Sequence, residues 1–552
     1  MKNHGFVRVG AIVPKVKVAN CKYNADEIIK GIEEARRAGV QIVAFPELSL
    51  TGATCGDLFS QKVLIESVKT ELRRICGETK GITAIIGAPI RDCSAAVVMN
   101  DGHIVGIVPK KDREDEIDGI PFSADLVFSD GDFSFSIWHD NGAAMIFDLA
   151  ASKELVGKHD YRRDFVRVQS AELDCAYIYV SAGVHESTTD ILCGGSAIIA
   201  ENGTVIKENE RFSFEPSFIY EDVDVQRLAS GSSGIQIDLG EGTPIKRHYS
   251  RTPFVPENEL EKMARCEEIL AIQSCALAKR LVHTGVEKCV VGLSGGLDST
   301  LAFLVVLETY KRLDISNKNL IAVVMPGFGT TDRTYNNAVE LAKTHGVTLR
   351  EIDIKPAVLQ HFDDIGHNGA HDITYENAQA RERTQILMDI ANMENAIVIG
   401  TGNMSELALG WCTYNGDHMS MYAVNSGVPK TIIPHMVQHV LGDSDILKTP
   451  ISPELIPGQV TEDVVGPYIL HDFFLYHFLR YGASPAKILY LAVHAFPERD
   501  DIKKWLEIFL KRFFAGQFKR NCMPDGVAVG TVSLNNLSMP SDADVEVWLD
   551  DV

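Results

Sequence analysis

The stretch Val290-Val291-Gly292-Leu293-Ser294-Gly295-Gly296-Leu297-Asp298-Ser299 decides the fold of the second half of this chain. Its apolar, β-branched beginning predicts a buried strand, and the apolar run over 300–307 predicts a buried helix directly after it. Two glycines between them let the backbone close around an anion at the helix N-terminus, where free amide groups point outward. No Gly-Lys-Ser/Thr follows at the spacing of the lysine-bearing phosphate loop. The stretch therefore predicts a phosphate-binding loop of another kind.

The side chains of this loop suit a polyphosphate and the magnesium ion that accompanies it. Ser294 and Ser299 add hydroxyl donors, and Asp298 can hold Mg²⁺. The loop resembles the pyrophosphate loop of enzymes that split ATP into AMP and pyrophosphate. The resemblance implies that ATP is a substrate.

Composition and charge exclude several classes of partner. The formal net charge of −22 over 552 residues argues against nucleic acid or an anionic membrane as the main partner. The eleven cysteines are scattered without a Cys-x-x-Cys pair, which predicts reduced thiols in a cytoplasmic protein rather than disulfides or zinc. No apolar run reaches membrane length, and the N-terminus lacks the core of a signal peptide. We expect a cytoplasmic protein that acts on small molecules.

Strand and helix alternate through the second half, which predicts a parallel sheet with helices on both faces. Ligands of such sheets bind at the carboxyl ends of the strands, so the loops after Leu293, Met325 and Gly400 are the expected site. The expected strands are 290–293, 320–326, 348–354 and 396–400, and the expected helices are 301–311, 335–345 and 376–393.

The first half, up to about residue 250, predicts many strands and several helices. Asp101-Gly102 and Asn202-Gly203 are hairpin signals between apolar runs. Glycine, three prolines and a basic patch over 240–258 predict a linker. The expected strands are 6–13, 40–45, 82–90 and 95–99, with a helix over 25–38. The expected domains are 1–250 and 276–552, joined by a linker and connecting helix over 251–275.

Two segments of the second half carry side chains that could bind a charged substrate. Asn377 and Arg381 lie one helical turn apart, so they share a face that can read a polar head group and a phosphate. Thr401 and Glu406 follow another expected strand, and Glu406 can supply a second carboxylate for Mg²⁺. Because these segments follow strands of one sheet, they predict a single site.

With these residues in place, the chain resembles the NAD⁺ synthetases of the two-domain, glutamine-dependent family, in which a nitrilase-like amidase precedes the synthetase. The resemblance covers essentially all of 260–552 and makes other pyrophosphate-loop enzymes, such as GMP synthetase or asparagine synthetase, poor fits. Besides the loop, it is carried by the strings Leu407-Ala408-Leu409-Gly410-Trp411, Tyr414-Asn415-Gly416-Asp417-His418-Met419, Thr449-Pro450-Ile451-Ser452-Pro453-Glu454-Leu455, His471-Asp472-Phe473-Phe474, Gln517-Phe518-Lys519-Arg520 and Met539-Pro540-Ser541-Asp542.

The resemblance implies both a fold and a reaction. The fold is α/β: an N-terminal nitrilase-like αββα sandwich, then a C-terminal doubly wound parallel sheet of the adenine-nucleotide α-hydrolase-like kind. In the reaction, ATP adenylates the carboxylate of deamido-NAD⁺ and releases pyrophosphate, and ammonia then displaces AMP. The implied residues are Ser294, Gly295, Gly296, Asp298, Ser299 and Thr401 for ATP, Asn377, Arg381, Glu406, Asp417, Lys430 and Lys519 for deamido-NAD⁺, and Asp298 and Glu406 for Mg²⁺.

The first half resembles a nitrilase-type amidase but departs from it at the nucleophile. That chemistry needs a Glu base, a Lys that stabilises the oxyanion and a Cys that attacks glutamine. The Glu motif is present at Phe45-Pro46-Glu47-Leu48 and the Lys motif at Ile107-Val108-Pro109-Lys110. No cysteine lies between Ser94 and Asp174, and the segment that should carry it is expected to be deleted. Glu47 and Lys110 are then the remains of an amidase site, or an ion pair that holds the sheet ends together.

Three functions stay open at this point. The first is a ligase that takes ammonia directly, with an inactive amidase-like domain. The second is a glutamine-dependent ligase whose nucleophile has moved, for instance to Cys55, Cys175 or Cys193, or whose motif is misaligned. The third is a structural or regulatory partner of an active synthetase, which the intact loop 294–299, Glu406 and Lys519 disfavour. The resemblance also implies a homo-oligomer.

Overall fold

The computed structural model describes residues 2–111, 114–131, 133–189, 191–228, 233–240, 242–448, 455, 461–535 and 537–552. The part of the family-like string that spans 449–454 lies outside the described residues. The chain divides into two compact units, Met1–Arg247 and His248–Val552. Each unit is described by itself below.

The described part of the first unit contains two sheets. In the first sheet the strands lie in the order β14 (Ser217–Asp224), β1 (Phe6–Val13), β2 (Ile42–Ala44), β3 (Thr83–Ile90), β4 (Cys93–Asn100), β5 (His103–Pro109), β7 (Ile120–Ser123) and β6 (Glu114–Ile117). In the second sheet the order is β13 (Thr204–Glu208), β12 (Ala197–Glu201), β11 (Ala176–Ser181), β10 (Met145–Ala150), β9 (Phe133–Ile137), β8 (Phe128–Asp130) and β15 (Ile235–Gln236).

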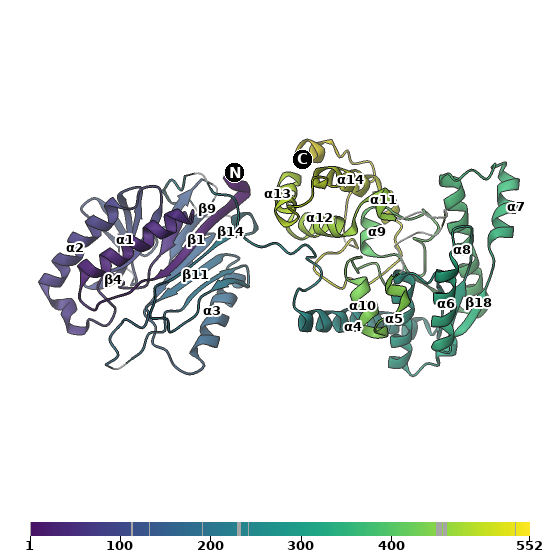
Figure 1. Ribbon diagram of the computed structural model, residues 1–552, viewed down its shortest axis with the longest axis horizontal. Coiled ribbons are helices and arrows are strands. Elements are labelled where there is room, and N and C mark those ends of the chain that lie inside the picture. The colour runs from purple at the N-terminus through teal and green to yellow at the C-terminus, as the bar shows by residue number, and fades with distance from the viewer. Residues whose placement is uncertain are drawn as a thin grey trace. The chain divides into compact units, whose positions relative to one another are not determined.

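Alternating side chains of these strands build the layers of the unit. Val9 and Ile85 of the first sheet share a core with Phe147 and Ile178 of the second, so the two sheets pack face to face. The outer face of the first sheet packs against α1 (Cys21–Arg37) and α2 (Lys62–Gly77). The outer face of the second packs against α3 (Lys158–Glu172), as Figure 1 shows. The expected αββα sandwich is therefore confirmed.

Local sequence signals of the first unit also match the structure. Strand β1 has the bounds expected from its apolar run, Phe6–Val13. Asp101 and Gly102 both have positive φ (47° and 82°), as do Asn202 and Gly203 (42° and 80°). This is the backbone of a two-residue type I′ hairpin, which matches the right-handed twist of the strands that it joins.

The second unit is built on one parallel sheet. Among the described residues its strand order is β18 (Thr348–Glu351), β17 (Leu320–Val324), β16 (Lys288–Gly292), β19 (Ala396–Gly400) and β20 (Tyr422–Ala423). Cys289 and Val291 face one core, whereas Val290 between them faces the other. The first core is closed by α4 (Glu259–Thr284), α5 (Leu297–Leu313), α6 (Asp332–Thr344) and α10 (Ile433–Leu441), and the second by α7 (Lys355–Ile365) and α8 (Ile373–Glu394). The doubly wound sheet is confirmed.

Further helices follow the last strand and carry residues that reach the site. Helix α12 (Tyr468–Tyr481) packs against α13 (Pro485–Ala495) and α14 (Ile502–Ala515), and the short helix α9 (Met404–Ala408) contacts α12 and α15 (Gln517–Arg520). Aromatic rings of Phe473, Phe474 and Phe509 fill the space between α12 and α14. Two further short helices of this part are α11 (Thr461–Val465) and α16 (Glu546–Asp550).

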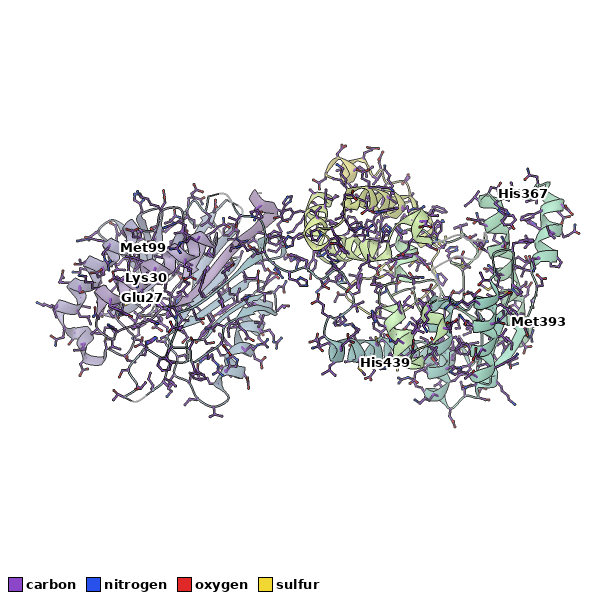
Figure 2. All side chains as sticks on the ribbon, viewed as in Figure 1. Glu27, Lys30, Met99, His367, Met393 and His439 are labelled. Carbon is purple, nitrogen blue, oxygen red and sulfur yellow. The ribbon has the colours of Figure 1, made fainter. Side chains whose placement is uncertain are left out.

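Most charged side chains of the described residues lie on the surface, and mainly apolar side chains fill the core. Lys30 and Glu27, one turn apart on α1, form an ion pair of 2.6 Å, whereas Met99 of β4 is fully buried (Figure 2). Over the described residues, none of the helices combines the length and the apolar character that crossing a membrane requires.

Candidate active site

A cavity of about 500 Å³ lies at the carboxyl ends of β16, β17 and β19 in the second unit. These are neighbouring strands of the sheet, so their loops converge at one place. Most of the residues predicted from the sequence line it. They are Ser294, Gly296, Asp298, Ser299, Asn377, Thr401, Glu406, Asp417, Lys430 and Lys519.

The loop between β16 and α5 has the conformation that an anion site needs. Helix α5 begins at Leu297, so the amides of its first turn point toward the cavity. The Ser299 hydroxyl donates to the Gly296 carbonyl oxygen (3.2 Å) and accepts from the Ser294 amide (3.2 Å), which holds the loop closed. Gly295 has φ +84°, and a Cβ there would overlap the carbonyl oxygen of Thr334 in α6. Position 295 therefore requires glycine, both for its positive φ and for its close contact with the backbone of α6.

A buried ammonium joins the two carboxylates expected to hold magnesium. Lys430 is 4% exposed, and its Nζ bonds to Asp298 Oδ2 and to Glu406 Oε1, the latter at 3.0 Å. Burial alone would lower the pKa of Lys430, but the two carboxylates outweigh it and raise that pKa. Burial raises the pKa of Glu406 to about 7, although Lys430 opposes the shift. Asn403 Nδ2 donates to Asp298 Oδ1 (3.0 Å) and fixes the rotamer of that carboxylate.

A third carboxylate, that of the fully buried Asp472, holds the two segments of this ion cluster together. Asp472 on α12 accepts bonds from the Ser405 hydroxyl, the Thr431 amide (2.9 Å) and the Thr431 hydroxyl (2.7 Å). The Ser405 oxygen in turn accepts from the Lys430 amide (2.8 Å). Asp472 thereby ties the helix that carries Glu406 to the segment that carries Lys430.

Three of the residues expected at the deamido-NAD⁺ site, Asn377, Asp417 and Lys519, converge on the segment 410–413. Thr413 donates its hydroxyl to Asn377 Oδ1 (2.8 Å) and its amide to Asp417 Oδ1 (2.7 Å). Lys519 Nζ donates to the carbonyl oxygens of Gly410 (2.8 Å) and Cys412 (2.6 Å). Burial raises the pKa of Asp417. Amide, carboxylate and ammonium groups thus line one wall of the cavity.

Two predicted residues do not line the cavity. Gly295 packs beneath the loop against α6, and Arg381 is exposed with its Nε bonded to the Tyr414 carbonyl oxygen (3.3 Å). Sequence reasoning missed the cavity-lining residues Arg383, Trp411 and Arg512. Trp411 and Arg383 stand inside segments singled out in the sequence, whereas nothing in the local sequence around Arg512 distinguishes it from other surface arginines.

The donor set fits magnesium with a nucleotide bound. Among the described residues no group of three or more His, Cys, Asp or Glu side chains could hold a metal ion. Asp298 and Glu406, however, both reach the same Lys430 Nζ, so their oxygens converge. Mg²⁺ in nucleotide sites takes one or two protein carboxylates and completes its shell with phosphate oxygens and water.

In the first unit, Glu47 and Lys110 form an ion pair. Lys110 Nζ lies 2.6 Å from Glu47 Oε2, and the two side chains are 43% and 12% exposed. A Cβ at Gly87 would overlap the backbone of Pro46 and Leu48, and Leu48 has φ +56°. Such a φ is uncommon for leucine and marks a backbone held by its surroundings.

An indole ring lies beside this pair. Trp138 directly follows β9 with φ +62°, and Lys110 Nζ lies 5.7 Å from its ring centroid. The indole Nε1 donates to the Leu149 carbonyl oxygen (2.7 Å), and the ring packs against the core between the two sheets. The position next to Lys110 on the second sheet is thus filled by an aromatic side chain that cannot act as a nucleophile.

Comparison with known proteins assigns the family. The family model described as NAD synthase matches residues 270–504. A glutamine-dependent NAD⁺ synthetase of Mycobacterium bovis is 33% identical over 664 aligned positions, covering 100% of this chain and 98% of that protein. The chain belongs to the glutamine-dependent NAD⁺ synthetase family. The enzyme of that name from Aquifex aeolicus is 26% identical over 92% of this chain and 94% of its own length. A crystal structure of the synthetase from Cytophaga hutchinsonii covers 99% of both chains at 20% identity and a TM-score of 0.45.

This family member is shorter than its mycobacterial relative. The alignment has 664 positions and the chain has 552 residues, so at least 112 positions of the alignment are gaps in this chain. The two sequences still match from end to end. The gaps are therefore internal to the alignment, in keeping with deleted segments.

Most cysteines of the first unit lie in hydrophobic cores. Cys55 and Cys93 pack in the core beneath α1 and α2, and Cys175 packs in the core beneath α3. Burial raises the pKa of Cys175 to about 12 and that of Cys193 to about 11. Burial also raises the pKa of Cys55, whose thiol donates to the Thr51 carbonyl oxygen (3.3 Å). The thiols of Cys55, Cys175 and Cys193 are therefore poor nucleophiles at neutral pH and have the environment of structural cysteines.

Proposed function

We propose that this chain converts deamido-NAD⁺ to NAD⁺ in an ATP-dependent reaction that releases AMP and pyrophosphate. One observation carries the proposal: a single cavity holds the loop 294–299, the Lys430-linked carboxylates and the Asn377–Asp417–Lys519 wall. A nucleotide site and a second polar substrate site therefore open on the same space, as the formation of a mixed anhydride between two substrates requires.

The residues supply positioning and charge stabilisation. The substrate carboxylate attacks the α-phosphorus of ATP, and the bond from that phosphorus to pyrophosphate breaks. The amides that open α5 and the hydroxyls of Ser294 and Ser299 stabilise the leaving pyrophosphate. Ammonia then attacks the acyl carbon, AMP leaves, and the surplus proton passes to solvent. No protein nucleophile takes part, because the activated group forms on the substrate itself.

Asp298 and Glu406 are the residues that would hold magnesium. When bound there, the ion neutralises phosphate charge, and this is the chemistry that it adds. The buried Lys430 keeps the two carboxylates close together before a nucleotide arrives. Without that ammonium, repulsion between two poorly solvated carboxylates would spread them apart.

Ammonia is the proposed direct nitrogen donor, and the amidase-like unit is proposed to be inactive. Trp138 next to Lys110, and cysteines packed in other cores, support this assignment. Without a thiolate no acyl-enzyme forms on glutamine. The relatives are named glutamine-dependent, which favours the alternative that this chain also uses glutamine, through a relocated or misaligned nucleophile.

The ligase proposal is tested by pyrophosphate release that depends on deamido-NAD⁺. The wild type should release pyrophosphate and form NAD⁺ with ammonium, and Asp298→Ala should lower the rate about a thousandfold or more. Lys519→Ala should depress synthesis with either nitrogen source, because it acts after ammonia arrives. Rates like those of the wild type in Asp298→Ala would contradict the assignment.

The nitrogen source is tested with ammonium and glutamine in parallel. We expect synthesis with ammonium, little gain from glutamine, and no stoichiometric labelling by a glutamine-mimicking alkylator. Strong glutamine-driven synthesis that is lost in Cys55→Ala or Cys193→Ala would instead establish the relocated nucleophile.

Three expectations from the sequence stay predictions: a cytoplasmic location, a homo-oligomer, and the domain bounds near residues 250 and 276. Light scattering on the purified protein measures the oligomeric state, and limited proteolysis measures the bounds.

A further inference from the structure

One cationic side chain of the cavity has no acidic or hydrogen-bonding partner among the residues that the structure describes. Among the described residues, the cationic side chains that line the cavity belong to Arg383, Lys430, Arg512 and Lys519. Lys430 bonds to two carboxylates, Lys519 to two carbonyl oxygens, and Arg383 Nε to the Met325 carbonyl oxygen (3.2 Å). Within the described part of the chain, the Arg512 side chain has neither a hydrogen-bond acceptor nor an acidic partner.

In its surroundings, a charged Arg512 side chain without an anion is energetically unfavourable. Its Cζ lies 5.2 Å from the ring centroid of Trp411, which also lines the cavity. The side chain is half-buried, and burial lowers its pKa. Stacking on an aromatic face compensates only part of the desolvation of a guanidinium. A half-buried arginine without an anion is therefore suited to an anion that arrives with a ligand.

The backbone fixes Arg512 next to the wall formed by 410–413. A Cβ at Gly410 would lie 2.9 Å from the Gly516 Cα, so the end of α14 presses directly on this segment. Arg512 stands in α14, which ends at Ala515, and Lys519 stands in the short helix α15, which begins at Gln517. Lys519 Nζ donates to the carbonyl oxygens of Gly410 and Cys412, and the Arg512 guanidinium lies over the ring of Trp411, the residue between them. Both cations therefore reach the segment 410–412.

We propose that Arg512 binds a phosphate group of a nucleotide substrate in this cavity. The inference rests on the proposed function, in which both ATP and deamido-NAD⁺ bring phosphates into the cavity. The planar guanidinium pairs with two phosphate oxygens at once. The carboxylate of deamido-NAD⁺ is a poorer match, because one of its oxygens must stay free to attack ATP. The phosphate comes from one of the two nucleotides, and the experiment separates them.

The test is nucleotide binding to the full-length protein, measured by calorimetry without turnover. Arg512→Met keeps an unbranched apolar side chain against Trp411 and removes the charge. Arg512→Lys keeps the charge but lacks the planar guanidinium that can pair with two oxygens. We expect Arg512→Met to raise the dissociation constant of one nucleotide about tenfold or more, with a smaller rise in Arg512→Lys. The matched control is Lys511→Gln, which removes one exposed charge from the neighbouring position of α14 and should change both constants less than twofold.

The outcomes separate this inference from the proposed function. If only the dissociation constant of ATP rises, Arg512 binds a phosphate of ATP. If only that of deamido-NAD⁺ rises, Arg512 binds a phosphate of the dinucleotide. Constants within twofold of the wild type for both nucleotides, in every Arg512 variant that folds, overturn the inference. A wild type that binds both nucleotides but forms no NAD⁺ with ammonium overturns the proposed function, while the binding comparison still decides the role of Arg512.

Discussion

Removing the Asp472 carboxylate should destabilise the second unit and misplace its ion cluster. The carboxylate is fully buried and accepts bonds from the Ser405 hydroxyl and from the amide and hydroxyl of Thr431. Asp472→Ala leaves these three donors without an acceptor, at about 1–3 kcal/mol each, so we expect a loss of about 3–9 kcal/mol. Asp472→Asn keeps one oxygen for Thr431 and can donate to Ser405, so we expect about 1–2 kcal/mol. The loss in Asp472→Ala is comparable to the whole stability of a marginal domain.

The same change should slow synthesis, because Ser405 also accepts from the Lys430 amide and precedes Glu406. A shift of about 1 Å in such groups lowers the rate about a hundredfold. The assay is urea unfolding followed by tryptophan fluorescence, alongside ammonium-driven NAD⁺ formation. Three of the four tryptophans lie in the second unit, so the signal reports mainly on it. Exposed Asp463→Ala is the control. An unfolding free energy within about 1 kcal/mol of the wild type in Asp472→Ala would refute the reasoning.

Three more predictions follow. Gly295→Ala should destabilise the second unit by about 2–5 kcal/mol and weaken ATP binding, because it adds a Cβ at φ +84° against the Thr334 backbone. The control is Gly296→Ala, where a Cβ has room, and it should lower the free energy of unfolding by less than about 1 kcal/mol in the same assay. Burial lowers the pKa of His471 from 6.5 to about 4, so as the pH falls the unfolded chain binds this proton before the folded one does. The free energy of unfolding should therefore decrease by up to about 3 kcal/mol as the pH drops from about 6.5 to 4. In a series of unfolding measurements over this pH range, His471→Phe should remove most of that decrease. Lys110→Ala should leave the rate of ammonium-driven synthesis unchanged. It should lower the free energy of unfolding by at most about 1 kcal/mol, because its ion pair with Glu47 is partly solvated. A large drop in the rate would show that the first unit serves the ligase reaction directly.

Local patterns made much of the fold predictable. The apolar run of β1, the Asp101-Gly102 turn and the strand–loop–helix at 288–313 each carry their own signal, because their conformation depends on near neighbours. Helix α7 (Lys355–Ile365) was not predicted, although Pro356 stands at its first turn, where proline favours a helix start. Its apolar face is set by packing on α8 rather than by a long periodic pattern.

The site was predictable only where it is continuous in sequence. The loop 294–299 could be recognised because its glycines, hydroxyls and carboxylate act together within six residues. The bond between Lys430 and Asp298 joins residues 132 positions apart, and no local pattern encodes it. Asp472 and Arg512 act through segments brought together by the packing of α9, α12 and α14. In the first unit the sequence indicates that a cysteine is missing, but the placement of Trp138 beside Lys110 depends on the pairing of the sheets.

The late position of Lys519 has a consequence for how the chain is made. It leaves the ribosome 220 residues after Ser299, which at about 5–20 residues per second is a delay of roughly 10 to 45 s. During that time the loop is already synthesised, but the part of the cavity wall contributed by α14 and α15 does not yet exist. A nascent chain therefore cannot capture a nucleotide in the finished cavity. Since a ligand stabilises only the state that binds it, cellular ATP would favour completed molecules and leave truncated ones to proteolysis.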